Sequence, residues 1–141
     1  MEKLTSAEKS IFIRCLCETI QDIVFFKNPN GEYIFANHAF EQLYGYTLEQ
    51  IKGKSDHAFL TKDEADNFAV RDKEAMDAGE PTRSEAWQVN ELTGENECYE
   101  TIKTPVYSEE GHLMGLLGVV KNVTKLRQAE QVLRVKNPPK P

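Results

Sequence analysis

The side chains with the clearest catalytic potential in this sequence are Asp56, His57 and Asp63. Carboxylates near a histidine can act as general acids and bases. The sequence around them has no nucleophile paired with a base, no phosphate-binding glycine loop and no dense set of metal ligands. We therefore expect no enzymatic activity from this chain. Asp56 and His57 are predicted to lie in a solvated loop, with the mouth of a pocket as the alternative.

The cysteines are the other candidates for chemistry. Cys15 and Cys17 are two residues apart in a helical stretch, so their side chains point in different directions, and Cys98 is distant in the sequence. This odd number of thiols predicts no disulfide framework. The spacing also lacks the CxxC geometry of a zinc site, and the histidines are scattered. We expect buried or unreactive thiols and no metal.

Composition limits the class of protein. A chain of 141 residues, 40% hydrophobic and 28% charged, is long enough for one globular domain with its own core. A net charge of -6 without a Lys/Arg cluster argues against a nucleic-acid partner. No apolar run is long enough to span a bilayer, and the N-terminus is too polar for a signal peptide. We expect a cytoplasmic location and no membrane segment within this chain.

The N-terminal part of the chain predicts a helix followed by a hairpin. Thr5 and Glu8 have capping-box spacing, and apolar residues then recur at helical intervals. Two β-rich runs, 22–27 and 32–37, flank the turn sequence NPNG.

The rest of the chain predicts helices and then strands. Asn37, Thr47 and Thr61 are candidate N-caps, the last for a longer helix. Three strand-like runs follow, at 82–90, 97–108 and 112–123, and a final helical run ends in a Pro-rich stretch. This order indicates an α+β fold around one antiparallel sheet.

Several segments, in order and spacing, resemble the PAS family of sensor domains. They are FFKNPNGEYIFANHAFEQLYGYTLEQIKGKSDHAF, DAGEP, YETIKTPVYSEEGHLMGLLGVV and the closing NVT. The resemblance implies the PAS fold, a five-stranded antiparallel sheet with a helical flank. It divides the chain into an N-terminal amphipathic helix (1–21), a PAS domain (22–124) and a C-terminal signalling helix with linker (125–141).

PAS domains commonly precede histidine kinases, diguanylate cyclases or other signalling modules, so the resemblance implies sensing without chemistry of the domain's own. The expected function is to bind a small molecule and to pass the change through the terminal helices to a covalently linked output domain. A ligand-free PAS domain, used for dimerisation or protein interaction, is the alternative.

The residues that PAS subfamilies use for flavin and haem argue against both cofactors. Flavin-binding LOV domains have a reactive Cys where this chain has Asp56, and they have Asn, Asn and Gln where it has Val89, Tyr99 and Val120. A photoadduct needs the thiol, and the apolar residues would leave polar flavin atoms unpaired. Haem-binding PAS domains use a His on the long helix, and 61–79 contains none. No resident cofactor is expected.

The resemblance, combined with strand alternation, predicts the side chains that face the cavity. They are Trp87, Val89, Tyr99, Thr101, Lys103, Met114, Leu116 and Val120. Such a lining suits a small organic ligand, with Lys103 as partner for a carboxylate. Two alternatives remain: Lys103 reaches water or pairs with a local carboxylate, and Trp87 and Tyr99 simply fill the core.

Asn122 and Thr124 are predicted to relay the signal at the end of the last strand. The PAS family usually ends this strand with Asp-Ile-Thr, whereas this chain has Asn122-Val123-Thr124. Because Asn lacks the charge of Asp, we expect no charged contact here and a weaker hinge.

Both terminal helices have apolar faces. Leu126, Ala129 and Leu133 make one heptad of a coiled-coil seam, which is too short to hold a dimer alone. This helix is expected to lead into the next module, with folding back on the domain as the alternative. The N-terminal helix is expected to form a homodimer interface, or to pack on its own sheet, or both. Its predicted contact residues are Phe12, Ile13, Leu16 and Ile20.

Overall fold

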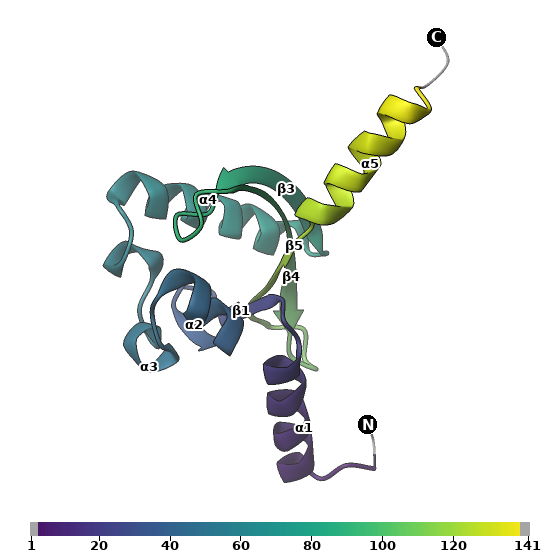
Figure 1. Cartoon of the computed structure of the whole chain (residues 1–141). Coiled ribbons are helices and arrows are strands. Elements are labelled where there is room, and N and C mark those ends of the chain that lie inside the picture. Colours follow the sequence, from purple (N-terminus) through teal and green to yellow (C-terminus); the bar gives the residue numbers. More distant parts are fainter. Residues whose placement is uncertain (1–2, 139–141) are drawn as a thin grey trace.

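The computed structural model describes residues 3–138, so the last three residues of the predicted linker, 139–141, lie outside it. Figure 1 shows one sheet, a group of helices on one side of it, and a helix at each end of the chain. The elements are α1 (Ser6–Thr19), β1 (Ile23–Lys27), β2 (Tyr33–Ala36), α2 (His38–Tyr44), α3 (Leu48–Ile51), the 3-10 helix η1 (Asp56–Ala58), α4 (Lys62–Ala78), β3 (Thr82–Val89), β4 (Asn96–Tyr107), β5 (Leu113–Asn122) and α5 (Thr124–Lys136). The predicted α+β architecture is confirmed.

The sheet has the order β2-β1-β5-β4-β3, and every neighbouring pair is antiparallel. The first and last strands therefore lie side by side in its middle, with Ile23 opposite Val120 and Phe25 opposite Gly118. A Cβ at Gly118 would overlap the Phe25 ring, so the absence of a side chain lets this ring lie across β5.

Side-chain caps fix where the helices begin. Thr5 with Glu8, and Thr47 with Gln50, form complete capping boxes at the starts of α1 and α3. The Thr61 hydroxyl accepts a hydrogen bond from the backbone of the first turn of α4. These predicted helix starts are confirmed.

The core lies between the sheet and the layer formed by α2, α3, η1 and α4 (Figure 1). Phe25, Tyr33 and Phe40 pack edge to face, with ring centroids 5.5 to 6.2 Å apart. The buried cluster consists of Ile23, Phe25, Tyr33, Ala36, Phe40, Ile51, Tyr99 and Val120. The face of the sheet that carries this cluster is its inner face.

Asn37 is fully buried and joins the N-terminal helix to the core. Its Oδ1 accepts hydrogen bonds from the backbone N–H groups of Val24 (3.0 Å) and Phe40 (3.1 Å). Its Nδ2 donates to the carbonyls of Cys17 (3.1 Å) and Asp22 (2.9 Å). The predicted N-cap of α2 is therefore also the attachment point of α1.

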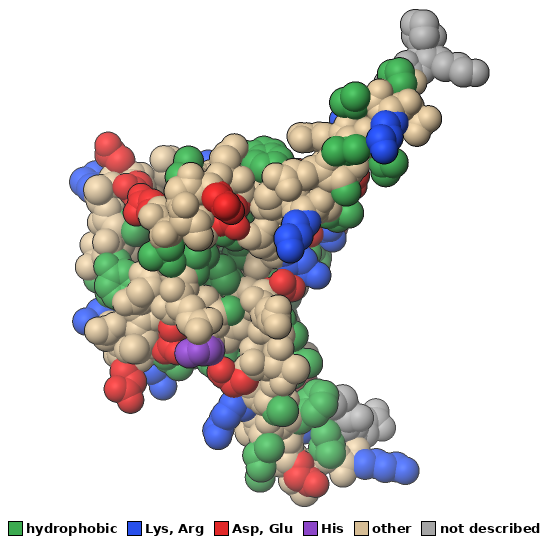
Figure 2. Space-filling view, viewed as in Figure 1, with side chains coloured by type: hydrophobic (Ala, Val, Ile, Leu, Met, Phe, Trp, Pro, Cys, Tyr) green, Lys and Arg blue, Asp and Glu red, His purple; other side chains and the backbone are tan. Residues whose placement is uncertain are grey.

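The terminal helices project from the body of the domain (Figure 1). Neither α1 nor α5 has a buried residue, and Figure 2 shows hydrophobic side chains exposed along both. The alternatives in which α1 packs on its own sheet, or α5 folds back, are therefore not seen. Within residues 3–138, no helix has the length and apolar character needed to cross a membrane.

Candidate functional site

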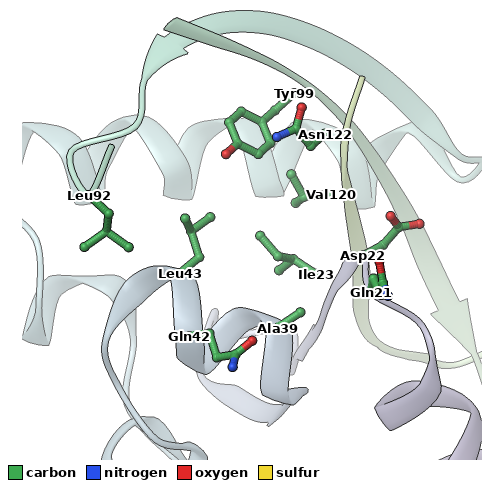
Figure 3. Close-up of a pocket in the computed structure, with 10 residues that line it drawn as sticks. All are labelled: Gln21, Asp22, Ile23, Ala39, Gln42, Leu43, Leu92, Tyr99, Val120 and Asn122. Carbon is green, nitrogen blue, oxygen red and sulfur yellow. The ribbon is translucent and has the colours of Figure 1, made fainter. Parts of the chain in front are cut away.

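A pocket of about 310 Å³ opens beside the core, at the edge of the sheet's inner face (Figure 3). Its walls come from α2, the start of β1, the turn after β3, and the strands β4 and β5. The lining residues are Gln21, Asp22, Ile23, Ala39, Gln42, Leu43, Leu92, Tyr99, Val120 and Asn122. Because residues 21 and 22 follow α1 and residue 122 precedes α5, the pocket touches the junctions of both terminal helices.

Two polar side chains of this pocket begin a hydrogen-bonded chain that ends at α5. Glu97 accepts hydrogen bonds from the Tyr99 hydroxyl (3.1 Å) and from Nδ2 of Asn122 (2.7 Å). Oδ1 of Asn122 in turn accepts from the backbone N–H of Thr124 (3.1 Å) and from its hydroxyl (2.5 Å). The Thr124 hydroxyl oxygen also accepts from the backbone N–H of Cys98 (2.9 Å). Helix α5, which has no side-chain cap of its own, is thus held at its first residue by Asn122.

A second attachment holds α5 to the opposite, outer face of the sheet. The Arg127 guanidinium donates to Oε1 of Glu85 on β3, at 2.6 Å from Nη2 and 2.9 Å from Nε. The same guanidinium also contacts Glu130 one turn further along α5. The hydrogen bonds from Arg127 lower the pKa of the Glu85 carboxyl, which keeps the pair charged at neutral pH.

A buried group of charges lies between the inner face of the sheet and α4. The Lys27 ammonium donates to Asp56 (2.6 Å) and to Asp72 (2.7 Å), and Lys103 donates to the other oxygen of Asp72 (2.5 Å). The Tyr33 hydroxyl donates to the second oxygen of Asp56 (2.6 Å). With two cations and two anions this buried charge cluster is neutral, and its hydrogen bonds compensate for desolvation of the charges.

Two aromatic rings lie beside the buried charge cluster, and a third, that of Tyr99, lines the pocket. The Lys27 ammonium lies 4.9 Å from the centroid of the Tyr33 ring and 5.5 Å from that of Phe25. Burial, together with the Asp56 charge, raises the pKa of Tyr33 well above its usual range. Burial and the hydrogen bond to Glu97 raise the pKa of Tyr99 to about 12. Both hydroxyls are therefore protonated donors at neutral pH.

The structure divides the predicted cavity residues among different places. Tyr99 and Val120 line the pocket, and Thr101 faces inward opposite Val120. Leu116 is buried in the interior. Lys103 also faces inward, but its ammonium is bound to the Asp72 carboxylate. Pairing with a local carboxylate was the alternative considered for this residue. Its role as an anchor for a ligand carboxylate stays a prediction.

Three of the predicted cavity residues do not face the interior. In the β3–β4 register, Trp87 lies opposite Cys98, whereas the inward-facing Tyr99 lies opposite Ala86. Trp87 and Val89 therefore project from the outer face, where Trp87 lies beside α5. Met114 lies where the β4–β5 register shifts, and its side chain is 51% exposed. The prediction that these three residues line the cavity is wrong.

The polar contacts correct one further prediction. Asp56 is not in a solvated loop, because it is bound to Lys27 and Tyr33 in the buried charge cluster. His57 does lie at the surface and contacts Asp66. At the end of β5 the neutral Asn122 amide donates a hydrogen bond to the Glu97 carboxylate, and the expected weaker hinge stays a prediction.

The most important residues that the sequence interpretation missed are Lys27, Asp72 and Glu97. Lys27 follows Ile23 and Phe25 at strand spacing, which places it on the same inner face. Asp72 lies on a helix face with buried Ala65 and Ala75. A charge at a core-facing position was the available signal for both residues.

The cysteines show no common site. Cys15 is exposed, Cys17 is half-buried and Cys98 is buried under the base of α5. The described part of the chain contains no group of three or more side chains that could hold a metal ion.

Comparison with solved structures supports the fold. The PAS domain of a protein from Colwellia psychrerythraea superposes with a TM-score of 0.61 and 21% identity, over 82% of this chain and 98% of that chain. The phage VqmA–DPO complex has a TM-score of 0.69 and 19% identity, over 96% of this chain and 63% of that chain.

Comparison with characterised sequences finds similarity to parts of two signalling proteins. It is 25% identical over 128 residues to the methanogenesis regulatory histidine kinase FilI of Methanothrix harundinacea, covering 91% of this chain but 14% of the kinase. It is 27% identical over 111 residues to a diguanylate cyclase of Vibrio cholerae, covering 78% of this chain and 35% of the cyclase. The chain thus spans a minor part of each relative. The family model PAS_4, described as the PAS fold, matches residues 17–128, and the chain belongs to this family.

Proposed function

We propose that this chain is the sensory module of a signal-transduction protein. A small molecule binds at the inner face of its sheet, and the terminal helices pass the change to a linked output domain, a histidine kinase or a diguanylate cyclase. The observation that carries this proposal is the position of the pocket, whose lining includes Asp22 after α1 and Asn122 before α5. A ligand bound there contacts both helix junctions at once.

The mechanism is a shift between two arrangements of the helix junctions. A ligand shifts such an equilibrium only by its different affinity for the two arrangements. The ligand's affinity differs between the two arrangements because its contacts compete with the hydrogen bonds that hold Asn122 and Thr124. In this mechanism the linked output domain carries out the catalysis, and the role of this chain is regulatory.

A ligand-free association module is the second candidate, and the exposed apolar side chains of α1 favour it. Phe12, Ile13 and Leu16 are 48%, 53% and 46% exposed, although they form one broad face. A second copy of the chain, packed along α1, would cover this face. Dimerisation and sensing can coexist, and we propose a homodimer for the sensor as well.

Native mass spectrometry of the freshly purified chain tests both candidates, because one spectrum reports the oligomeric mass and any retained small molecule. The sensor predicts a dimer carrying an adduct that Val120→Phe removes by filling the pocket. The matched control is Val89→Phe, which adds the same ring on the outer face and should keep the adduct.

A bare dimer, with no small molecule retained or bound in a subsequent thermal-shift screen, would favour the association module. Phe12→Glu should then separate the copies in sedimentation equilibrium. Ile34→Glu, on edge strand β2 and 40% exposed, is the matched control.

A further inference from the structure

The charge of the pocket limits the class of molecule that fits it. Among its ten lining residues, all in the described part of the chain, Asp22 is charged and none is Lys, Arg or His. Asp22 lies 3.6 Å from the Lys121 ammonium, a loose surface pair. Lys103, the predicted partner for an acid, is bound to Asp72 and is not part of this pocket.

Glu97 adds a second negative charge directly behind the lining. Each of its oxygens accepts a hydrogen bond from a pocket residue, one from Tyr99 and the other from Asn122. Hydrogen bonds from Asn90, Asn122 and Tyr99 lower the pKa of Glu97, so it is ionised at neutral pH. A carboxylate ligand would meet this charge with no Lys, Arg or His among the lining residues to balance it, whereas an ammonium group would be attracted.

The other walls of the pocket suit an apolar body. Ile23, Leu43, Leu92 and Val120 present aliphatic side chains around the space, and Figure 3 shows them on several sides of it. Small-molecule sites usually combine such walls with a few polar groups that fix orientation.

We infer that the pocket takes a small molecule with an apolar body and an amine head, and that Glu97 supplies the counter-charge. The inference rests on the proposed sensor function and names its ligand class. It replaces the carboxylate ligand expected from Lys103.

Amine binding at Glu97 also gives a route to the output helix. The ligand's ammonium competes with the Asn122 amide for the same carboxylate, at the oxygen now 2.7 Å from Nδ2. An Asn122 side chain released from Glu97 can turn, and it then no longer fixes the first residue of α5, Thr124. Occupancy of the pocket is thereby converted into a looser α5.

A titration of the full chain with three probes tests the inference. 2-Phenylethylamine, 2-phenylethanol and 3-phenylpropanoate share an aromatic body and differ in head-group charge. Backbone ¹H–¹⁵N NMR spectra give the affinity and the location for each probe. We expect the amine to shift the signals of Tyr99, Val120 and Thr124 and to bind about tenfold more tightly than the alcohol, because the ammonium carries a full charge opposite to that of Glu97 whereas the hydroxyl is neutral.

Variants at the acidic side chain complete the test. Glu97→Gln should reduce the amine's affinity to that of the alcohol, and Glu97→Asp should restore part of the preference. Glu91→Gln, an exposed residue in the turn after β3, removes the same charge nearby and should leave the preference unchanged.

Either of two affinity results would overturn the inference: tighter binding of the acid than of the amine, or an amine affinity that Glu97→Gln leaves unchanged. If the acid binds in the pocket and Val120→Phe abolishes its binding, the sensor proposal survives and the amine inference fails. If the amine causes no shift at millimolar concentration, the inference is also wrong.

Discussion

Replacing Asp72 by Asn should destabilise the domain by about 3 kcal/mol, because it breaks a buried and balanced set of charges. Both carboxylate oxygens of Asp72 are in use, one bound to Lys27 at 2.7 Å and the other to Lys103 at 2.5 Å. The asparagine has one acceptor oxygen and would place an amide donor against an ammonium donor. It also leaves two cations to share the single anion of Asp56.

The magnitude follows from burial. Removing one partner of a buried ion pair costs about 3–5 kcal/mol, and we expect the lower end because the Lys103 side chain is 13% exposed and can move toward water. For a chain of this length, about 3 kcal/mol corresponds to a melting temperature lower by about 10 °C. Urea unfolding followed by circular dichroism measures the free energy directly.

Two further variants make the result specific to the buried charge cluster. Asp77→Asn removes an exposed carboxylate from the same helix and should cost less than about 0.5 kcal/mol. Adding Lys103→Met to Asp72→Asn restores charge balance and should recover at least about 1 kcal/mol. A loss for Asp72→Asn no larger than that for Asp77→Asn would refute this account of the cluster.

Three further changes test other parts of the structure. Gly118→Ala should destabilise the domain by about 1–3 kcal/mol, because its Cβ overlaps the Phe25 ring; an unchanged urea midpoint would contradict this packing. Arg127→Ala should broaden the distance distribution between spin labels on α5 and β4 by releasing Glu85, with little change in the urea midpoint because the pair is solvent-screened, and an unchanged distribution would show that Arg127 does not position α5. Asn37→Ala should cost about 2–3 kcal/mol in urea unfolding, since it leaves buried backbone groups unpaired, and should increase amide exchange at the end of α1; equal exchange would contradict its role as the attachment point.

The local elements were predictable because their signals are local. A threonine followed three residues later by Glu or Gln marks a helix start, and the pairs at Thr5 and Thr47 each do so in the structure. The hairpin around NPNG was predictable for the same reason, because its turn residues and both strands are contiguous in sequence. Such patterns do not depend on distant parts of the chain.

The face of β3 was not predictable in this way. Its side chains are largely exposed, so hydrophobicity does not mark an inner side. The turn after β3 sets the register, which places Ala86, not Trp87, opposite Tyr99. Because a shift of one residue moves every side chain to the other face, this single difference displaced both Trp87 and Val89 from the predicted cavity.

The buried charge cluster depends on partners far apart in sequence. Lys27 contacts Asp56 and Asp72, which are 29 and 45 residues away. A charge on an apolar strand or helix face indicates that a partner exists, but only the packing of α4 against the sheet identifies it. The same limit applies to Glu97, whose neighbour Asn122 comes from another strand.

The contrast between the buried charge cluster and the hinge explains why α5 is the part that should respond to a ligand. Asp72 ties α4 to two strands through buried, charged contacts, and breaking them costs about 3 kcal/mol. Asn122 is exposed and Thr124 is half-buried, and each hydrogen bond between them contributes about 1 kcal/mol. The least stable contacts open first. A ligand with modest binding energy can therefore loosen α5 while the charge cluster keeps the helical layer fixed on the sheet.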